Sequence, residues 1–155
     1  MPSQAESIQN SEIEFVTFSV SKQIFCLEIQ QINEIRRWSH VTILPHAPDD
    51  VLGVMNLRGA VIPIYDLATS LGLGRTPQGE RSVVIVSSVA ENPIGLLVDS
   101  VSEIISVNIE EIQNTPDVAS SATRECIDGI VSVEDQMARI VNLNSVIATR
   151  EVSRA

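Results

Sequence analysis

The chain has 155 residues and carries 20 Asp and Glu against 10 Lys and Arg, which gives a formal net charge of −10. This charge argues against binding to a nucleic-acid backbone, because such binding relies on clustered cations that displace counterions from phosphates. Val and Ile contribute 19 residues each, and side chains branched at Cβ favour strands over helices. The composition therefore predicts a β protein, and its length allows one ordinary domain or two small ones.

Two hairpins are predicted in the first half of the chain. Val/Ile-rich segments broken by turns or prolines favour, in chain order, strands at 15–20 and 24–29, a helical turn at 30–33, extended chain at 34–38, a proline loop at 44–50, and strands at 51–57 and 60–65. The second hairpin closes at Arg58-Gly59, where Gly59 can adopt the positive φ of a tight turn. Asp66 is a candidate N-cap for a short helix over 67–71, and the Gly-rich stretch 72–81 is predicted to be a linker.

The second half of the chain repeats the first. Residues 25–35 resemble 94–104 at an offset of 69, whereas 51–54 and 64–67 resemble 127–130 and 140–143 at an offset of 76. Asp66 and Asn142 occupy equivalent positions, and both are good N-caps. Such a repeat predicts two similar β units, and five short strands cover their apolar face most simply by closing into a small barrel.

We therefore expect a single domain over residues 15–148 that consists of two barrel units, about 15–71 and 82–148, joined by the linker 72–81. Residues 1–14 and 149–155 are expected to be tails, the first of them flexible. The acidic charge is shared unevenly, with −3 over residues 1–75 and −7 over 76–155.

No motif in the chain predicts catalysis or a bound cofactor. There is no Gly-rich phosphate loop with its Lys, no nucleophile elbow, and only two histidines. Cys26 and Cys126 are 100 positions apart and have no metal-ligand spacing, so two buried, reduced thiols are expected. The most informative segment is 56–59, because it places Arg58 at an accessible hairpin tip where its guanidinium could bind a carboxylate. Glu34 is a candidate partner for Arg58 within the chain.

These segments resemble the CheW family of bacterial chemotaxis scaffolds. The resemblance rests on residues 18–35, 51–59, 61–67, 82–105 and 127–143. It implies an all-β fold of two five-stranded SH3-like barrels with short helices, enclosing a mixed core. It also implies a non-catalytic adaptor that binds the cytoplasmic tip of chemoreceptors and the regulatory domain of the histidine kinase CheA, with no cofactor.

The resemblance further implies partner-binding positions in this chain, without saying which partner each one serves. They are Ile32, Glu34, Ile35, Gly53, Asn56, Arg58, Gly59, Val83, Val101 and Ile104. For Val83, Val101 and Ile104, a place in the core is an equally good interpretation.

Two alternatives remain open from the sequence. The chain could be a CheW-like scaffold of a non-flagellar chemosensory pathway or, remotely, a double β-barrel that binds a small ligand. We expect a cytoplasmic chain that is monomeric in isolation, joins receptor arrays through its partners, binds no nucleic acid and does not insert into a membrane.

Overall fold

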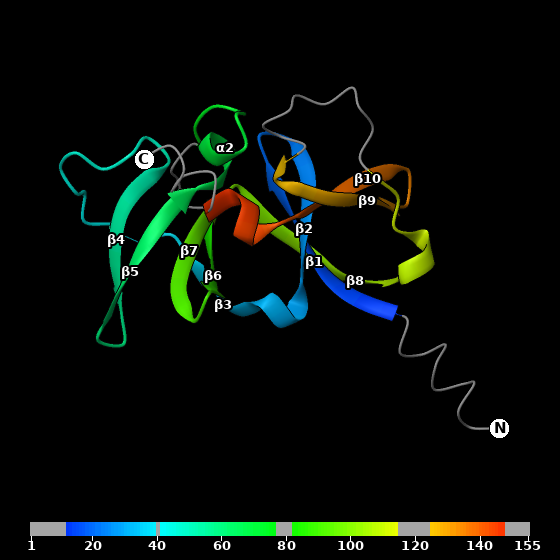
Figure 1. The fold of residues 1–155 in the computed structure, drawn as a ribbon, viewed down its shortest axis with the longest axis horizontal. Helices are drawn as coiled ribbons and strands as arrows, with labels where there is room; N and C mark the ends of the chain where they lie inside the picture. Colours follow the sequence, from blue (N-terminus) through cyan, green and yellow to red (C-terminus); the bar gives the residue numbers. More distant parts are fainter. Residues whose placement is uncertain (1–11, 40, 77–81, 115–124, 148–155) are drawn as a thin grey trace.

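The computed structural model describes residues 12–39, 41–76, 82–114 and 125–147. In this part of the chain ten strands form two five-stranded sheets that lie side by side (Figure 1). The strands are β1 (Glu12–Val20), β2 (Gln23–Glu28), β3 (Ile32–Arg37), β4 (Val51–Leu57), β5 (Ala60–Asp66), β6 (Val83–Val89), β7 (Asn92–Val98), β8 (Ser100–Asn108), β9 (Ile127–Val133) and β10 (Gln136–Val141). The short helices include η1 (Ile29–Gln31), α2 (Leu67–Ser70) and η2 (Ile109–Glu111). The predicted all-β class with short helices is confirmed.

The strands are shared between the sheets in a way that corrects the predicted division of the chain. The first unit has the strand order β8-β1-β2-β10-β9, and the second unit has the order β3-β6-β7-β5-β4. The first unit thus combines the hairpin of β1 and β2 with three strands from the second half of the chain, and the second unit combines the hairpin of β6 and β7 with three strands from the first half. The units therefore do not coincide with residues 15–71 and 82–148. The reason is that the hairpin of β1 and β2 pairs with β8 and β10, whereas the hairpin of β6 and β7 pairs with β3 and β5. A repeat predicts which segments are alike, but it does not predict which copy each strand will pair with.

The repeat itself is confirmed down to the strand register. Replacing β1–β5 by β6–β10, and the reverse, converts one strand order into the other. In the parallel pair β5–β7, Ile64 lies opposite Gly95, and in the parallel pair β10–β2, Ile140 lies opposite Cys26. Ile140 lies 76 positions after Ile64, and Gly95 lies 69 positions after Cys26, which are the offsets that relate the repeated sequence segments. The two units therefore have one architecture with two sets of side chains.

A close backbone approach recurs in both units. Thr42 forms a bridge with Val54 across the second unit, and Gln113 forms a bridge with Ile130 across the first. The neighbouring glycines leave room for it, because a Cβ on Gly53 would lie 2.1 Å from the Thr42 carbonyl oxygen and a Cβ on Gly129 would lie 2.8 Å from that of Gln113. Each bridge links the segment after one edge strand to the opposite edge strand of the same sheet, which is compatible with a small barrel.

Both predicted helix caps are present. Asp66 Oδ1 accepts a hydrogen bond from the Ala68 amide at 3.2 Å, and Asn142 Oδ1 accepts one from the Ser145 amide at 2.9 Å. Asp66 is buried and also accepts hydrogen bonds from the amide and hydroxyl groups of Thr76. It therefore holds the start of the predicted linker against the second unit. Residues 77–81 of that linker lie outside the described residues.

Three clusters of apolar side chains form the core. One lies inside the first unit around Phe15, Val107 and Val131, and a second lies inside the second unit around Met55, Ile62 and Val84. The third and largest draws on strands of both units and on α2, so it joins them. Burial of each large aliphatic or aromatic side chain contributes about 1.5–3 kcal/mol. Both cysteines are free and buried, and burial raises the pKa of Cys26 to about 12.

The predicted tails are only partly described. β1 begins at Glu12, within the predicted N-terminal tail, and residues 1–11 and 149–155 lie outside the described residues. In the described parts of the chain, no helix has both the length and the apolar character required to cross a lipid bilayer.

Candidate partner-binding surfaces

The predicted hairpin tip at Arg58-Gly59 is present between β4 and β5. Both residues have a positive φ, 51° for Arg58 and 88° for Gly59, which is the backbone of a two-residue turn that suits twisted strands. The Asn56 side chain supports the turn, because its Oδ1 accepts a hydrogen bond from the Gly59 amide at 3.1 Å. Asn56 and Gly59 thus shape the tip, and the Arg58 side chain, 70% exposed, is the group that it presents.

Glu34 forms the predicted ion pair with Arg58. Arg58 Nη2 lies 2.5 Å from Glu34 Oε2, and Arg36 Nη1 lies 3.2 Å from Glu34 Oε1. The hydrogen bond from Arg58 is the main reason why the pKa of Glu34 lies below its usual value. A guanidinium has five N–H donors, so Arg58 keeps donors for a second carboxylate while Glu34 orients it.

A β-bulge sets the position of Glu34 on β3. Ile32 pairs with Ser87 and Glu34 with Val86, which leaves Asn33 as the extra residue. Ile32 packs against the central core, and the Ser87 hydroxyl donates a hydrogen bond to the Gln31 carbonyl. Bulges re-aim the side chains that follow them. Here the bulge brings Glu34 within reach of the hairpin tip from another strand.

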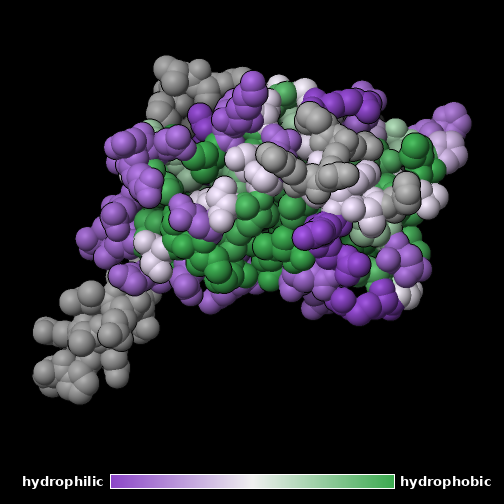
Figure 2. All heavy atoms as spheres, turned by 180° about the vertical axis from the view of Figure 1, so that it is seen from behind, coloured by the Kyte–Doolittle hydropathy of each residue, from purple (hydrophilic) through white to green (hydrophobic). Residues whose placement is uncertain are grey.

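Two isoleucines at equivalent positions of edge strands, Ile35 on β3 and Ile104 on β8, are exposed to solvent. Their exposed fractions are 44% and 57%, and they are equivalent positions of the repeat. Val83 and Val101 are half-buried and pack against the central core, so both interpretations offered by the sequence apply to them in part. Figure 2 shows hydrophobic residues gathered over the middle of one face, with hydrophilic residues towards both ends.

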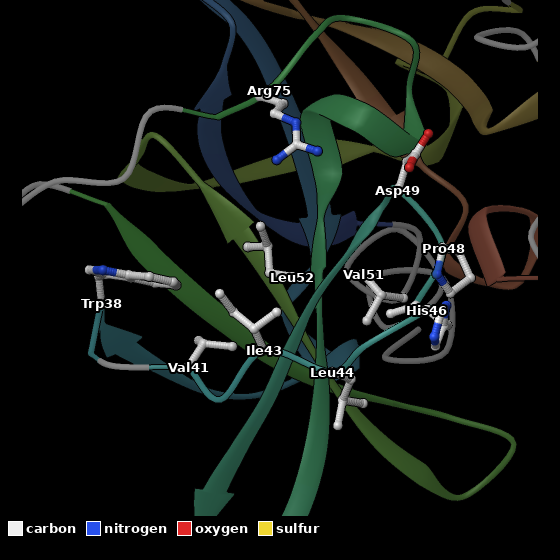
Figure 3. A pocket seen from close by; sticks show the side chains of 11 residues that line it. Trp38, Val41, Ile43, Leu44, His46, Pro48, Asp49, Val51, Leu52 and Arg75 are labelled. Carbon is white, nitrogen blue, oxygen red and sulfur yellow. The ribbon is translucent and has the colours of Figure 1, made fainter.

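A hollow of about 530 Å³ lies at one end of the second unit (Figure 3). Its lining includes Trp38, Ile43, Leu44, Leu52 and Arg75. Ile43 is 79% exposed and Leu44 is 42% exposed, which is unusual for large aliphatic side chains side by side. Arg75 approaches the hollow from the opposite side to Ile43 and Leu44 (Figure 3). The structure thus assembles an end pocket of mixed character, in which aliphatic side chains lie beside the polar groups of His46, Asp49 and Arg75.

The structure gives the predicted site residues different roles. Glu34, Ile35, Arg58 and Ile104 present groups to solvent, whereas Ile32, Gly53, Asn56 and Gly59 support the backbone that carries them. Glu34 and Arg58 are in contact, but Ile35 and Ile104 lie on different sheets. The end pocket was missed by sequence reasoning. The apolar pair Ile43-Leu44 before Pro45 was the available signal, because a solvated loop rarely begins with two large aliphatic residues.

The described residues contain no cluster of three or more His, Cys, Asp or Glu side chains arranged to hold a metal ion. The surfaces described above present exposed aliphatic groups and an oriented guanidinium.

Comparison with known proteins identifies a family. The model of the CheW-like domain matches residues 14–151. The chain is 42% identical over 151 residues to the chemotaxis protein CheW of Rhizobium meliloti, with 97% of each chain covered. It is 27% identical over 133 residues to protein FrzA of Myxococcus xanthus, covering 86% of this chain and 82% of the relative. The solved structure of the scaffolding protein TtCheW from Thermoanaerobacter tengcongensis superposes with a TM-score of 0.79 at 29% identity, covering 84% of each chain.

Proposed function

Because this chain belongs to the family of CheW-like domains, which act as scaffolds in chemotaxis, we propose that it is a non-catalytic adaptor that couples chemoreceptors to the histidine kinase CheA. Its place of action is the cytoplasmic side of a membrane receptor array, which it joins through its partners. The observation that carries the proposal is that the molecule presents two separate sets of exposed aliphatic side chains. An adaptor needs two such surfaces, since it has to bind two partners at once.

The receptor tip is assigned to the edge strands β3 and β8, which carry Ile35 and Ile104 and lie next to Val83 and Val101 of the central core. An extended helical hairpin needs a long apolar contact, and β3 and β8 are edge strands of the two sheets. Arg58, oriented by Glu34, supplies a charged contact beside it.

The regulatory domain of the kinase is assigned to the end pocket. Ile43 is the most exposed large aliphatic residue in the described part of the second unit, Leu44 follows it in the chain, and Trp38 lines the same hollow. Large apolar and aromatic side chains that become buried on association carry most of the binding free energy of an interface. Arg75 at the rim would select a partner surface that bears a carboxylate.

Co-elution of the purified chain with each partner separately tests the proposal. Ile35→Asp should weaken binding to a receptor cytoplasmic fragment about tenfold or more and spare the kinase domain, whereas Ile43→Asp should do the reverse. Met137→Asp is the matched control, because Met137 is also an exposed apolar residue but lies on β10, outside both surfaces. If wild type binds neither partner, the proposed function fails. If Ile35→Asp and Ile43→Asp fold and bind both partners normally, the surface assignments fail.

A further inference from the structure

The first unit contains an acidic hollow beside its own hairpin tip. The hollow has a volume of about 300 Å³, and Glu103, Glu134 and Asp135 line it together with Ile24 and Val133. No Lys or Arg is among the described residues that line it. Acidic and aliphatic side chains thus share the lining of the hollow.

The repeat supplies an internal comparison for this hollow. Glu134 lies 76 positions after Arg58, and Glu103 lies 69 positions after Glu34, which are the offsets that relate the two units. The register agrees, because Glu103 pairs with Thr17 on β1 just as Glu34 pairs with Val86 on β6. Where the second unit holds an arginine–glutamate ion pair, the first unit therefore presents two carboxylates.

The backbone that carries Glu103 is already held in place. The Thr17 hydroxyl accepts a hydrogen bond from the Glu103 amide at 3.2 Å and donates one to the Glu103 carbonyl at 3.3 Å. Thr17 is 2% exposed, and the register shift between Thr17 and Phe18 repeats the bulge of β3. A carboxylate on a fixed backbone loses little freedom when it binds, which favours association.

The shape and lining of the hollow favour a guanidinium over a compact metal ion. The three carboxylates do not belong to any described cluster that could hold a metal ion, and a compact divalent ion needs several oxygen ligands at short distances. A planar guanidinium can bridge carboxylates that are further apart. Its aliphatic stem can also lie along Ile24 and Val133, as the stems of long cationic side chains do on apolar surfaces.

We propose that this acidic hollow receives an arginine side chain of a partner protein, in the place that Arg58 takes in the second unit. In the second unit, Glu34 pairs with Arg58 of the same chain. In the first unit, Glu103 gains an arginine partner only when the partner protein binds. This inference does not depend on the proposed function, because neither the receptor nor the kinase enters its argument or its test.

The test is an NMR titration of the ¹⁵N-labelled full chain at constant ionic strength. The probes are Nα-acetyl-arginine amide, the matching lysine compound and the uncharged citrulline compound. The arginine probe should shift the amide signals of residues 102–103 and 133–136, the lysine probe should do so more weakly, and the citrulline probe should not. In Glu134→Arg, which recreates the second unit's ion pair with Glu103, binding should weaken about tenfold, since the charge of the hollow is then neutralised internally.

Glu110→Arg is the control, because it makes the same charge change at an exposed residue of η2 that does not line the hollow. It should bind the arginine probe like wild type. If Glu134→Arg does not fold, Glu103→Gln tests the same point with a side chain of similar size. The inference is overturned if no probe shifts these signals, if lysine equals arginine, or if Glu110→Arg weakens binding as much as Glu134→Arg.

Discussion

The two units of this molecule have equivalent strand orders and share a β-bulge, a glycine beside a backbone bridge and a helix cap at equivalent positions. The charges at their hairpin tips, however, are opposite. Counted over strands and hairpin turns, the first unit has seven carboxylates and two cations, whereas the second has three of each. The residues that shape the two sheets are alike, whereas the residues at the hairpin tips differ. Positions that differ between the units are therefore the best guide to what each unit binds.

This comparison also explains the uneven charge of the two halves of the sequence. Residues 76–155 carry most of the negative charge, but β6 and β7 of that half belong to the second unit and have no charged residue. The acidic strands and turns instead meet in the first unit. The asymmetry is thus one between the units, and it is larger in space than along the chain. A charge asymmetry of this kind orients a protein in the electrostatic field of a charged partner.

Substitution of the glycines beside the two backbone bridges should give the largest effect on stability. Gly53→Ala should reduce the free energy of unfolding by about 3 kcal/mol or more, because its Cβ meets a backbone carbonyl and its φ of 155° is strained for other residues. Gly129→Ala should cost about 1–2 kcal/mol, because its contacts at 2.8 Å and 2.9 Å include a side chain that can move. Urea denaturation of both variants measures the difference. Equal losses of unfolding free energy in the two variants would contradict the expected difference between the two glycine positions.

Exchange of the helix caps should give intermediate effects. Asp66→Asn should cost about 1–2 kcal/mol, since the carboxylate accepts hydrogen bonds from both donors of Thr76 and an amide nitrogen cannot. Asn142→Asp should cost about 1 kcal/mol, because Asn142 Nδ2 donates to Asp128 Oδ1 at 2.8 Å and the variant would oppose two carboxylates. Thermal unfolding measures both. A stabilising effect of either exchange would contradict the view that each cap fits its own unit.

Removal of the ion pair between Arg58 and Glu34 should give the smallest effect on stability, but a clear effect on the pKa of Glu34. Arg58→Gln should raise the pKa of Glu34 towards its usual 4.5, because Arg58 is the main cause of its lowering. ¹³C NMR titration of the carboxyl groups measures this change, with Arg37→Gln as the control. A folded pKa below the unfolded one stabilises above pH 4.5 and loses that effect as the pH falls through the folded pKa. The small stability difference between wild type and Arg58→Gln should therefore vanish in acid, and an unchanged Glu34 titration would contradict the assignment.

The sequence predicted much of the candidate site that depends on local rules. The turn at Arg58-Gly59 follows from the positive φ that glycine accepts, and the pairing of Glu34 with Arg58 was a reasonable inference from an exposed cation at a tip. The end pocket was not predicted, because Trp38, Leu52 and Arg75 come from separate segments whose meeting depends on the fold. The burial of Ile32 and the exposure of Ile35 were also beyond reach, since the bulge at Asn33 interrupts the alternation of the strand.

The sequence by itself determined the strands, turns, caps and their duplication, because these depend on residues close together in the chain: branched side chains, glycines at turns, and Asp or Asn before a helix. Only the tertiary structure decided that the hairpins β1–β2 and β6–β7 each pair with strands of the opposite half, which brings the charges of one half into the unit of the other. Strand pairing over long sequence separations depends on which apolar faces are buried together, and two similar repeats offer similar faces to any one strand. The charge at each hairpin tip can therefore be read from the sequence, but its neighbours can be read only from the fold.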